Sequence, residues 1–84
     1  MKYEILLHEE AVAFWSALDR SDRERLLWAL KRLAAAPHQS PDFSEADGQG
    51  RPLSGFIEGA FALIVYVDDA VGEVRVIDLR YADN

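Results

Sequence analysis

The chain contains no cysteine, so neither a disulfide bond nor a thiolate zinc site can hold its fold together. Its two histidines, His8 and His38, lie far apart in the sequence and lack acidic or cysteine neighbours at the spacing of a metal site. We therefore expect no metal and no cofactor, and a fold that packing alone stabilises.

Long apolar runs are also missing. No stretch approaches the roughly 18 apolar residues that a membrane-spanning helix needs. The first ten residues, MKYEILLHEE, reach acidic side chains after only a few apolar ones and so lack the apolar region of a signal peptide. Together with the absence of cysteine, these features predict a cytoplasmic protein.

The composition is that of a small folded protein. Apolar residues make up 50% of the chain and charged residues 29%, which is the balance of a globular domain rather than of a disordered segment. A length of 84 residues leaves room for one core. We therefore expect a single domain over residues 1–84.

Acidic residues outnumber basic ones by 15 to 9, and this excess is unevenly distributed. Residues 1–36 contain six of each kind, whereas residues 37–84 contain nine acidic and three basic residues. An acidic surface repels phosphate groups, so free association with RNA or DNA is disfavoured unless a local basic face overrides the mean field.

The first half of the chain predicts a strand followed by two short helices. Residues 2–7 (KYEILL) have the aromatic and β-branched content of a strand. From Glu9 onward, apolar residues recur at helical spacing. A second helix over residues 22–35 follows Ser21 and Glu24, which have the spacing of a capping box. Its expected apolar stripe consists of Leu26, Leu27, Leu30, Leu33 and Ala34.

The second half predicts a loop and three strands. Residues 37–52 (PHQSPDFSEADGQGRP) show no periodicity and predict a long internal loop. Strand-like segments follow at residues 53–57, 60–68 and 73–79, and turn signals between them indicate an antiparallel meander. The segment AFALIVYV is apolar at nearly every position, so we expect it to be the central strand.

These elements predict an α+β fold in the order β-α-α-β-β-β. A helical hairpin packed on one face of a small twisted, mostly antiparallel sheet buries the apolar side of every element. The first strand is expected to join an edge of the meander in parallel orientation, because a right-handed crossover permits that pairing.

Two features predict a binding partner. Trp28 lies on the side of the second helix opposite its leucine stripe, and exposed tryptophans are enriched in interfaces. Ile64 and Tyr66 supply apolar surface to the sheet face that the helices leave open. A partner protein, a second copy of the chain or the loop containing Phe43 would each cover that face, and the sequence leaves the three open.

Several phrases in succession resemble the RelE/ParE toxin superfamily of type II toxin-antitoxin systems, of the plasmid stabilisation type. They are KYEILLHEEA, DRSDRERLLWALKRLAAAP, GAFALIVYVDD and EVRVIDLRY, and together they span almost the whole chain. The resemblance implies a small toxin that a cognate antitoxin holds inactive. It further implies one of two targets: messenger RNA cleaved on the ribosome, or DNA gyrase.

The resemblance also directs attention to the last strand. Family members commonly carry an arginine after an aromatic residue in the third strand, whereas here Ala62 follows Phe61. Arg80 and Tyr81, supported by Arg51, are the candidates that remain for phosphate chemistry, since arginine chelates phosphate and tyrosine donates a proton. A solvated strand end with a packed aromatic ring explains the same residues without catalysis.

Three functions therefore follow from the sequence and the resemblance. The first is a toxin-family protein that binds an antitoxin and cleaves messenger RNA. The second is a catalytically inactive interaction module that binds an antitoxin-like partner or forms a homodimer. The third is a gyrase inhibitor, which needs none of the RNA-cleaving residues.

Overall fold

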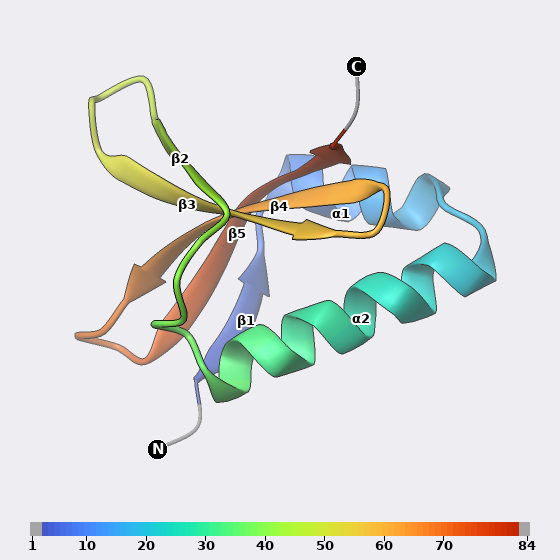
Figure 1. Cartoon of the computed structure of the whole chain (residues 1–84), viewed down its shortest axis with the longest axis horizontal. Coiled ribbons are helices and arrows are strands. Elements are labelled where there is room, and N and C mark those ends of the chain that lie inside the picture. The colour runs from blue at the N-terminus through green and yellow to red at the C-terminus, as the bar shows by residue number, and fades with distance from the viewer. Residues whose placement is uncertain (1–2, 83–84) are drawn as a thin grey trace.

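The computed structural model describes residues 3–82 and contains two helices and five strands. In chain order they are β1 (Glu4–Leu7), α1 (Glu9–Ala17), α2 (Arg20–Ala35), β2 (Phe43–Ala46), β3 (Pro52–Glu58), β4 (Phe61–Asp68) and β5 (Glu73–Tyr81). Both helices pack on one face of a twisted sheet (Figure 1). The predicted α+β architecture is confirmed, with one additional strand. No helix within residues 3–82 is long and apolar enough to span a membrane.

The five strands form one sheet in the order β1-β5-β4-β3-β2. β1 pairs with β5 in parallel, with Ile5 opposite Val74, and the other neighbours are antiparallel. This confirms the parallel placement of the first strand and the central position of β4. The predicted first strand also included Lys2, which lies outside the described residues.

The predicted loop over residues 37–52 is interrupted by β2, which pairs antiparallel with β3. The turn between them is built on Asp47, whose Oδ1 accepts the backbone N–H groups of Gln49 and Arg51 at 2.9 and 2.8 Å. Gly50 has a φ of +81°, a conformation that glycine adopts without steric cost. The sequence FSEA contains one large apolar residue, so its pairing depends on this turn more than on a strand pattern.

Helix α2 begins before the predicted capping box. Asp19 is the N-cap, because its backbone is extended and its Oδ1 accepts the N–H of Asp22 at 2.9 Å. Ser21 is therefore already helical, and the prediction that it caps the helix is wrong. Because α2 begins at Arg20, only Leu18 and Asp19 separate it from Ala17, the last residue of α1.

The core lies between the helices and one face of the sheet. Of the predicted stripe, Leu27 is 42% exposed, whereas Ala29 is buried in its place. Leu27 faces the gap between α2 and the sheet edge rather than the sheet centre. The buried cluster consists of Ala11, Leu18, Leu26, Ala29, Leu30, Leu33, Phe61, Leu63, Val65, Val74, Val76 and Leu79.

Candidate functional site

The sheet face that the helices leave uncovered, called here the open face, carries the predicted site residues except Tyr81 and Trp28. Because side chains alternate along a strand, paired residues on neighbouring strands share a face. Across β4 and β5 the register places Ala62 opposite Arg80, and Ile64 opposite Asp78. Their neighbours Leu63 and Leu79 belong to the helix-side core, so these two pairs lie on the open face.

Arg80 is held by carboxylates on two sides. Its Nη2 donates to Glu45 Oε1 at 2.7 Å, and its Nε lies 3.3 Å from Asp78 Oδ2. That Nε is buried and has no well-aligned acceptor among residues 3–82. Glu45 belongs to β2, so the strand that the sequence did not predict supplies the carboxylate closest to the candidate arginine.

Tyr81 turns away from the guanidinium of Arg80. As the next residue of β5 it points to the helix side, where its ring packs edge-on against Phe14 and beside Phe61 at centroid distances of 5.2 and 5.4 Å. Both residues nevertheless border one shallow hollow of about 320 Å³. The floor of this hollow includes Ala62, so an alanine occupies the position where the resemblance leads one to expect a cation.

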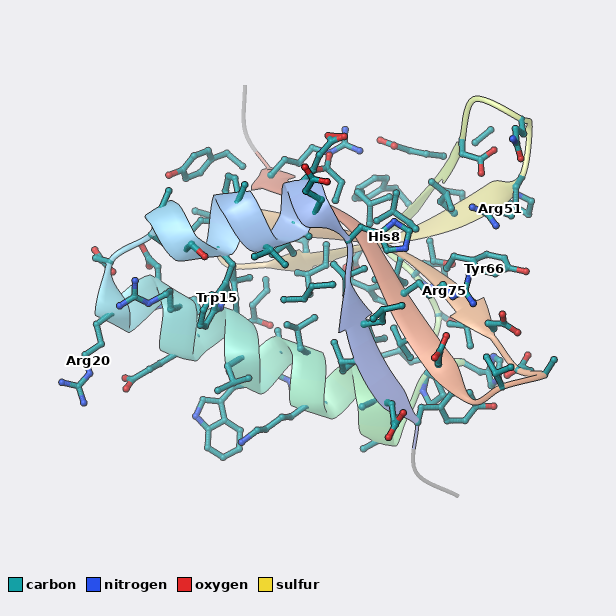
Figure 2. The ribbon with its side chains drawn as sticks, turned by 180° about the vertical axis from the view of Figure 1, so that it is seen from behind. His8, Trp15, Arg20, Arg51, Tyr66 and Arg75 are labelled. Atoms are coloured by element: carbon teal, nitrogen blue, oxygen red, sulfur yellow. The ribbon has the colours of Figure 1, made fainter. Side chains whose placement is uncertain are left out.

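Arg51 belongs to a different part of the open face. Its Cζ lies 4.3 Å from the centroid of the Tyr66 ring, and its Nε donates to Asp47 Oδ2 at 2.9 Å. Figure 2 shows Arg51 and Tyr66 on the same side of the sheet, with Arg75 nearby. Arg51 does not border the hollow of Arg80 and Tyr81. The structure therefore brings Arg80 and Tyr81 to one hollow and leaves Arg51 outside it. A shared catalytic role for these three residues stays a prediction.

The third arginine of the chain's second half, Arg75, is paired in the same way as Arg80. Its Nη2 lies 3.3 Å from Asp68 Oδ2 and its Nε 3.2 Å from Glu73 Oε1. Arg51, Arg75 and Arg80 are thus matched by five carboxylates, those of Glu45, Asp47, Asp68, Glu73 and Asp78. A phosphate group approaching any of these arginines meets at least one carboxylate beside the guanidinium, and that negative charge repels it.

One of these carboxylates is held firmly in its charged form. The pKa of Asp47 lies below its ordinary value, chiefly because the backbone N–H of Arg51 donates to it, followed by the N–H of Gln49. The charge of Arg51 lowers this pKa further. Asp47 therefore remains an anion beside Arg51 at neutral pH.

The predicted partner-binding residues have different surroundings. Trp28 is 63% exposed, as its position on α2 predicts, and the ammonium of Lys31 lies 5.3 Å from its ring centroid. Tyr66 is half-buried beneath Arg51. Ile64 is only 1% exposed, so the expectation that it offers surface to a partner is wrong.

Phe43 is the reason that Ile64 is buried. Gly55 pairs with Phe43 on one side and with Ile64 on the other, so these residues form one row on the open face. A Cβ atom added at Gly55 would lie 2.3 Å from Cζ of Phe43, which means that the ring occupies the space above the glycine. The sequence allowed a partner protein, a second copy of the chain or the loop containing Phe43 to cover the open face. In the structure, the segment containing Phe43 covers the part of the face around Ile64.

A second polar cluster, formed by Tyr3, His38 and Asp69, was not predicted from the sequence. The Tyr3 hydroxyl donates to Asp69 Oδ1 at 2.6 Å, and His38 Nε2 lies 2.8 Å from the same oxygen. The Tyr3 hydrogen bond is the main cause that lowers the pKa of Asp69, and it raises the pKa of Tyr3. No sequence signal links these residues, because each comes from a different segment. Within residues 3–82 no group of three or more acidic or histidine side chains is placed to hold a metal ion.

The chain is similar to known proteins in its three-dimensional structure. No family model and no curated protein matches the sequence. A chain of the archaeal RelE–RelB complex from Pyrococcus horikoshii OT3 superposes with a TM-score of 0.79 at 16% identity, covering 100% of this chain and 99% of that one. A chain of the RelBE2 toxin–antitoxin complex from Mycobacterium tuberculosis gives 0.77 at 13% identity, covering 96% and 99%.

The isolated RelE toxin of Escherichia coli is similar over the same span. It superposes with a TM-score of 0.74 at 21% identity, covering 98% of this chain and 86% of that chain. Agreement over whole chains at such low identity shows a shared fold. The chain therefore has the RelE-like fold, and the predicted α+β architecture is confirmed.

Proposed function

We propose, from the RelE-like fold of this chain, that it is the toxin-fold component of a type II toxin–antitoxin pair and binds a cognate antitoxin protein in the cytoplasm. The observation that carries the proposal is the whole-chain structural agreement with chains from RelE–RelB and RelBE complexes of an archaeon and two bacteria. The absence of cysteine supports a reducing compartment.

The open face favours protein binding over RNA cleavage. Cleavage of this kind needs cations that stabilise the phosphate charge, together with an acid and a base. Each arginine on this face is already paired with a carboxylate, and Ala62 supplies no charge. A toxin scaffold without nuclease activity, acting as an interaction module, is therefore the second candidate, and these carboxylate pairs are the observation in its favour.

The test is expression of the gene alone and together with any short open reading frame that adjoins it. We expect the neighbouring gene product to co-purify with this chain at a fixed ratio. We also expect it to relieve any growth arrest that the chain causes alone. A neighbour that neither binds the chain nor alters its effect on growth would refute the proposal.

Two single substitutions separate the modes of action. If the chain arrests growth by cleaving RNA through its hollow, Arg80→Ala and Tyr81→Phe should each relieve the arrest, and Arg75→Ala should not. Arg75 is the matched control because it lies on the same face with two carboxylate partners of its own. Arrest that survives both substitutions and coincides with loss of DNA supercoiling in vitro would identify gyrase as the target.

A further inference from the structure

Strand β2 is attached to the sheet by few contacts. It has four residues, lies at the edge of the sheet beside β3 and has no neighbouring strand on its other side (Figure 1). Ser44 and Ala46 are exposed, and Phe43 and Glu45 are only half-buried. Elements that bury little apolar surface open locally at a small cost in free energy. β2 can therefore lift from the sheet while the core between the helices and the sheet stays folded.

The guanidinium of Arg80, which β2 covers, is only half satisfied in this position. Its Nε and Nη2 lie on one edge of the planar group, where a single oxyanion can accept hydrogen bonds from both. Nη2 donates to Glu45 Oε1 at 2.7 Å. Nε, in contrast, is buried 3.3 Å from Asp78 Oδ2 and has no well-aligned acceptor among residues 3–82. A phosphate group that satisfied both nitrogens would take the position of the Glu45 carboxylate.

The charge around Arg80 depends on the position of β2. With Glu45 in place, two carboxylates face one guanidinium, and the net negative charge repels a phosphate. Without Glu45, Asp78 alone remains, and the two charges balance. Phe43 and Glu45 both line the hollow of about 320 Å³ beside Arg80. Lifting β2 therefore removes a wall of the hollow and a negative charge in one movement.

The segment that carries β2 is held at both of its ends. Before the strand, His38 Nε2 lies 2.8 Å from Asp69 Oδ1 in the turn between β4 and β5. After the strand, Asp47 accepts hydrogen bonds from the backbone and the side chain of Arg51, which closes the turn to β3. These attachments do not involve the residues of β2 itself. The strand can therefore lift and return to the same register.

We propose that β2 is a lid over Arg80, which Glu45 occupies when the lid is closed and which binds a phosphate group when the lid is open. The ring of Phe43, lying over Gly55, holds the lid closed. The apparent affinity for phosphate then follows the fraction of molecules with an open lid. The inference goes beyond the proposed function, because the lid belongs to this chain alone and acts with or without an antitoxin.

Gly55→Ala tests the lid without changing any charge. The added Cβ meets the ring of Phe43 and should lift β2, so the amides of residues 43–46 should exchange with solvent about tenfold faster or more. The Kd for a short single-stranded oligoribonucleotide, measured by fluorescence anisotropy at low salt, should fall by about the same factor as the open fraction rises. Gly48→Ala should change neither quantity, because a Cβ at Gly48 meets nothing within 4 Å.

A reversible disulfide closes the same lid. Ser44 of β2 lies opposite Ser54 of β3, on the face away from the hollow, because side chains alternate along a strand and Phe43 and Glu45 line the hollow. The chain has no cysteine of its own, so Ser44→Cys with Ser54→Cys gives one defined cross-link between paired strands. In the Gly55→Ala background, oxidation of this pair should abolish the gain in affinity, and reduction should restore it.

Two further variants locate the phosphate. Added to Gly55→Ala, Arg80→Ala should abolish the gain, whereas Arg75→Ala, on the same face with carboxylate partners of its own, should preserve it. If circular dichroism shows that Gly55→Ala does not fold, Phe43→Ala replaces it, since it removes the ring without crowding the sheet.

Three results would overturn the lid. The first is faster exchange in β2 without a gain in affinity, which would make the pair of Glu45 and Arg80 purely structural. The second is unchanged exchange in β2 in both Gly55→Ala and Phe43→Ala. The third is a gain that survives either the closed disulfide or Arg80→Ala. The proposed function is tested separately by the binding of the antitoxin, so it stands or falls independently of these results.

Discussion

At the scale of single residues, Phe43 owes its position to the missing side chain of Gly55. The ring lies where a Cβ atom of Gly55 would be, 2.3 to 2.5 Å from three of the ring carbons. A Cβ atom essentially never lies that close to a nonbonded carbon, so only glycine leaves room for the ring at this position. Through this packing β2 covers the open face above Ile64.

Gly55→Ala should therefore destabilise the protein by about 1–3 kcal/mol, the usual cost of adding a methyl group to a packed site. The ring of Phe43 has to move off the sheet, which exposes Ile64 and loosens β2. Urea unfolding followed by circular dichroism measures the loss. Gly48→Ala is the control, because a Cβ at Gly48 meets nothing within 4 Å. An equal loss from both substitutions would contradict the role of Phe43.

The candidate site was predictable from the sequence only in part. Arg80 was singled out by the family resemblance, which directs attention to the end of the last strand, and Trp28 by its position on the helix opposite the leucine stripe. Their surroundings were not, because Glu45 reaches Arg80 from a strand 35 positions earlier in the chain. The cluster of Tyr3, His38 and Asp69 was missed for the same reason: local pattern says nothing about which distant polar groups meet.

At the scale of helices and strands, the segments with the clearest periodic pattern of apolar residues are those whose secondary structure was predicted correctly. Both helices and the three long strands have enough apolar residues for their period to be read, and the parallel position of β1 followed from the crossover rule. β2 has only four residues and lies at a sheet edge, so it carries almost no pattern. The start of α2 was misplaced because Asp19 and Ser21 are both good capping residues two positions apart.

Two single substitutions decide between these caps. Asp19→Ala removes the acceptor for the Asp22 N–H and should lower the free energy of unfolding by about 1 kcal/mol. Ser21→Ala should change it by only a few tenths of a kcal/mol, because Ser21 lies inside the helix and alanine is a better helix former. Thermal and urea unfolding of the two variants measure both effects. A larger loss for Ser21→Ala would place the cap at the residue that the sequence suggested.

At the scale of the whole molecule, the charge of the second half of the chain is concentrated around the open face. All three basic residues of positions 37–84 are arginines with carboxylate partners there, and five carboxylates surround them. The face is therefore negative on balance, although it contains three guanidinium groups. Such a field repels RNA at a distance and favours a partner that does not depend on phosphate contacts.

If the carboxylate partners of Arg80 are what keeps RNA away, removing their charge should create RNA affinity. The double variant Glu45→Gln, Asp78→Asn frees Arg80 while preserving side-chain size. We expect it to bind a short single-stranded oligoribonucleotide more tightly than the unaltered chain at low salt, measured by fluorescence anisotropy. One arginine engaging one phosphate should steepen the dependence of log K on log salt concentration by about 0.7.

The control for this variant is Glu9→Gln, Glu10→Gln, which removes the same two charges from exposed positions in the first turn of α1. It changes the net charge equally but leaves Arg80 paired, so any gain should be small and the salt dependence should keep its slope. If both double variants gained affinity and slope alike, the effect would come from net charge alone. A gain confined to the open-face variant would show that the scaffold retains a phosphate-binding arginine that its own carboxylates hold occupied.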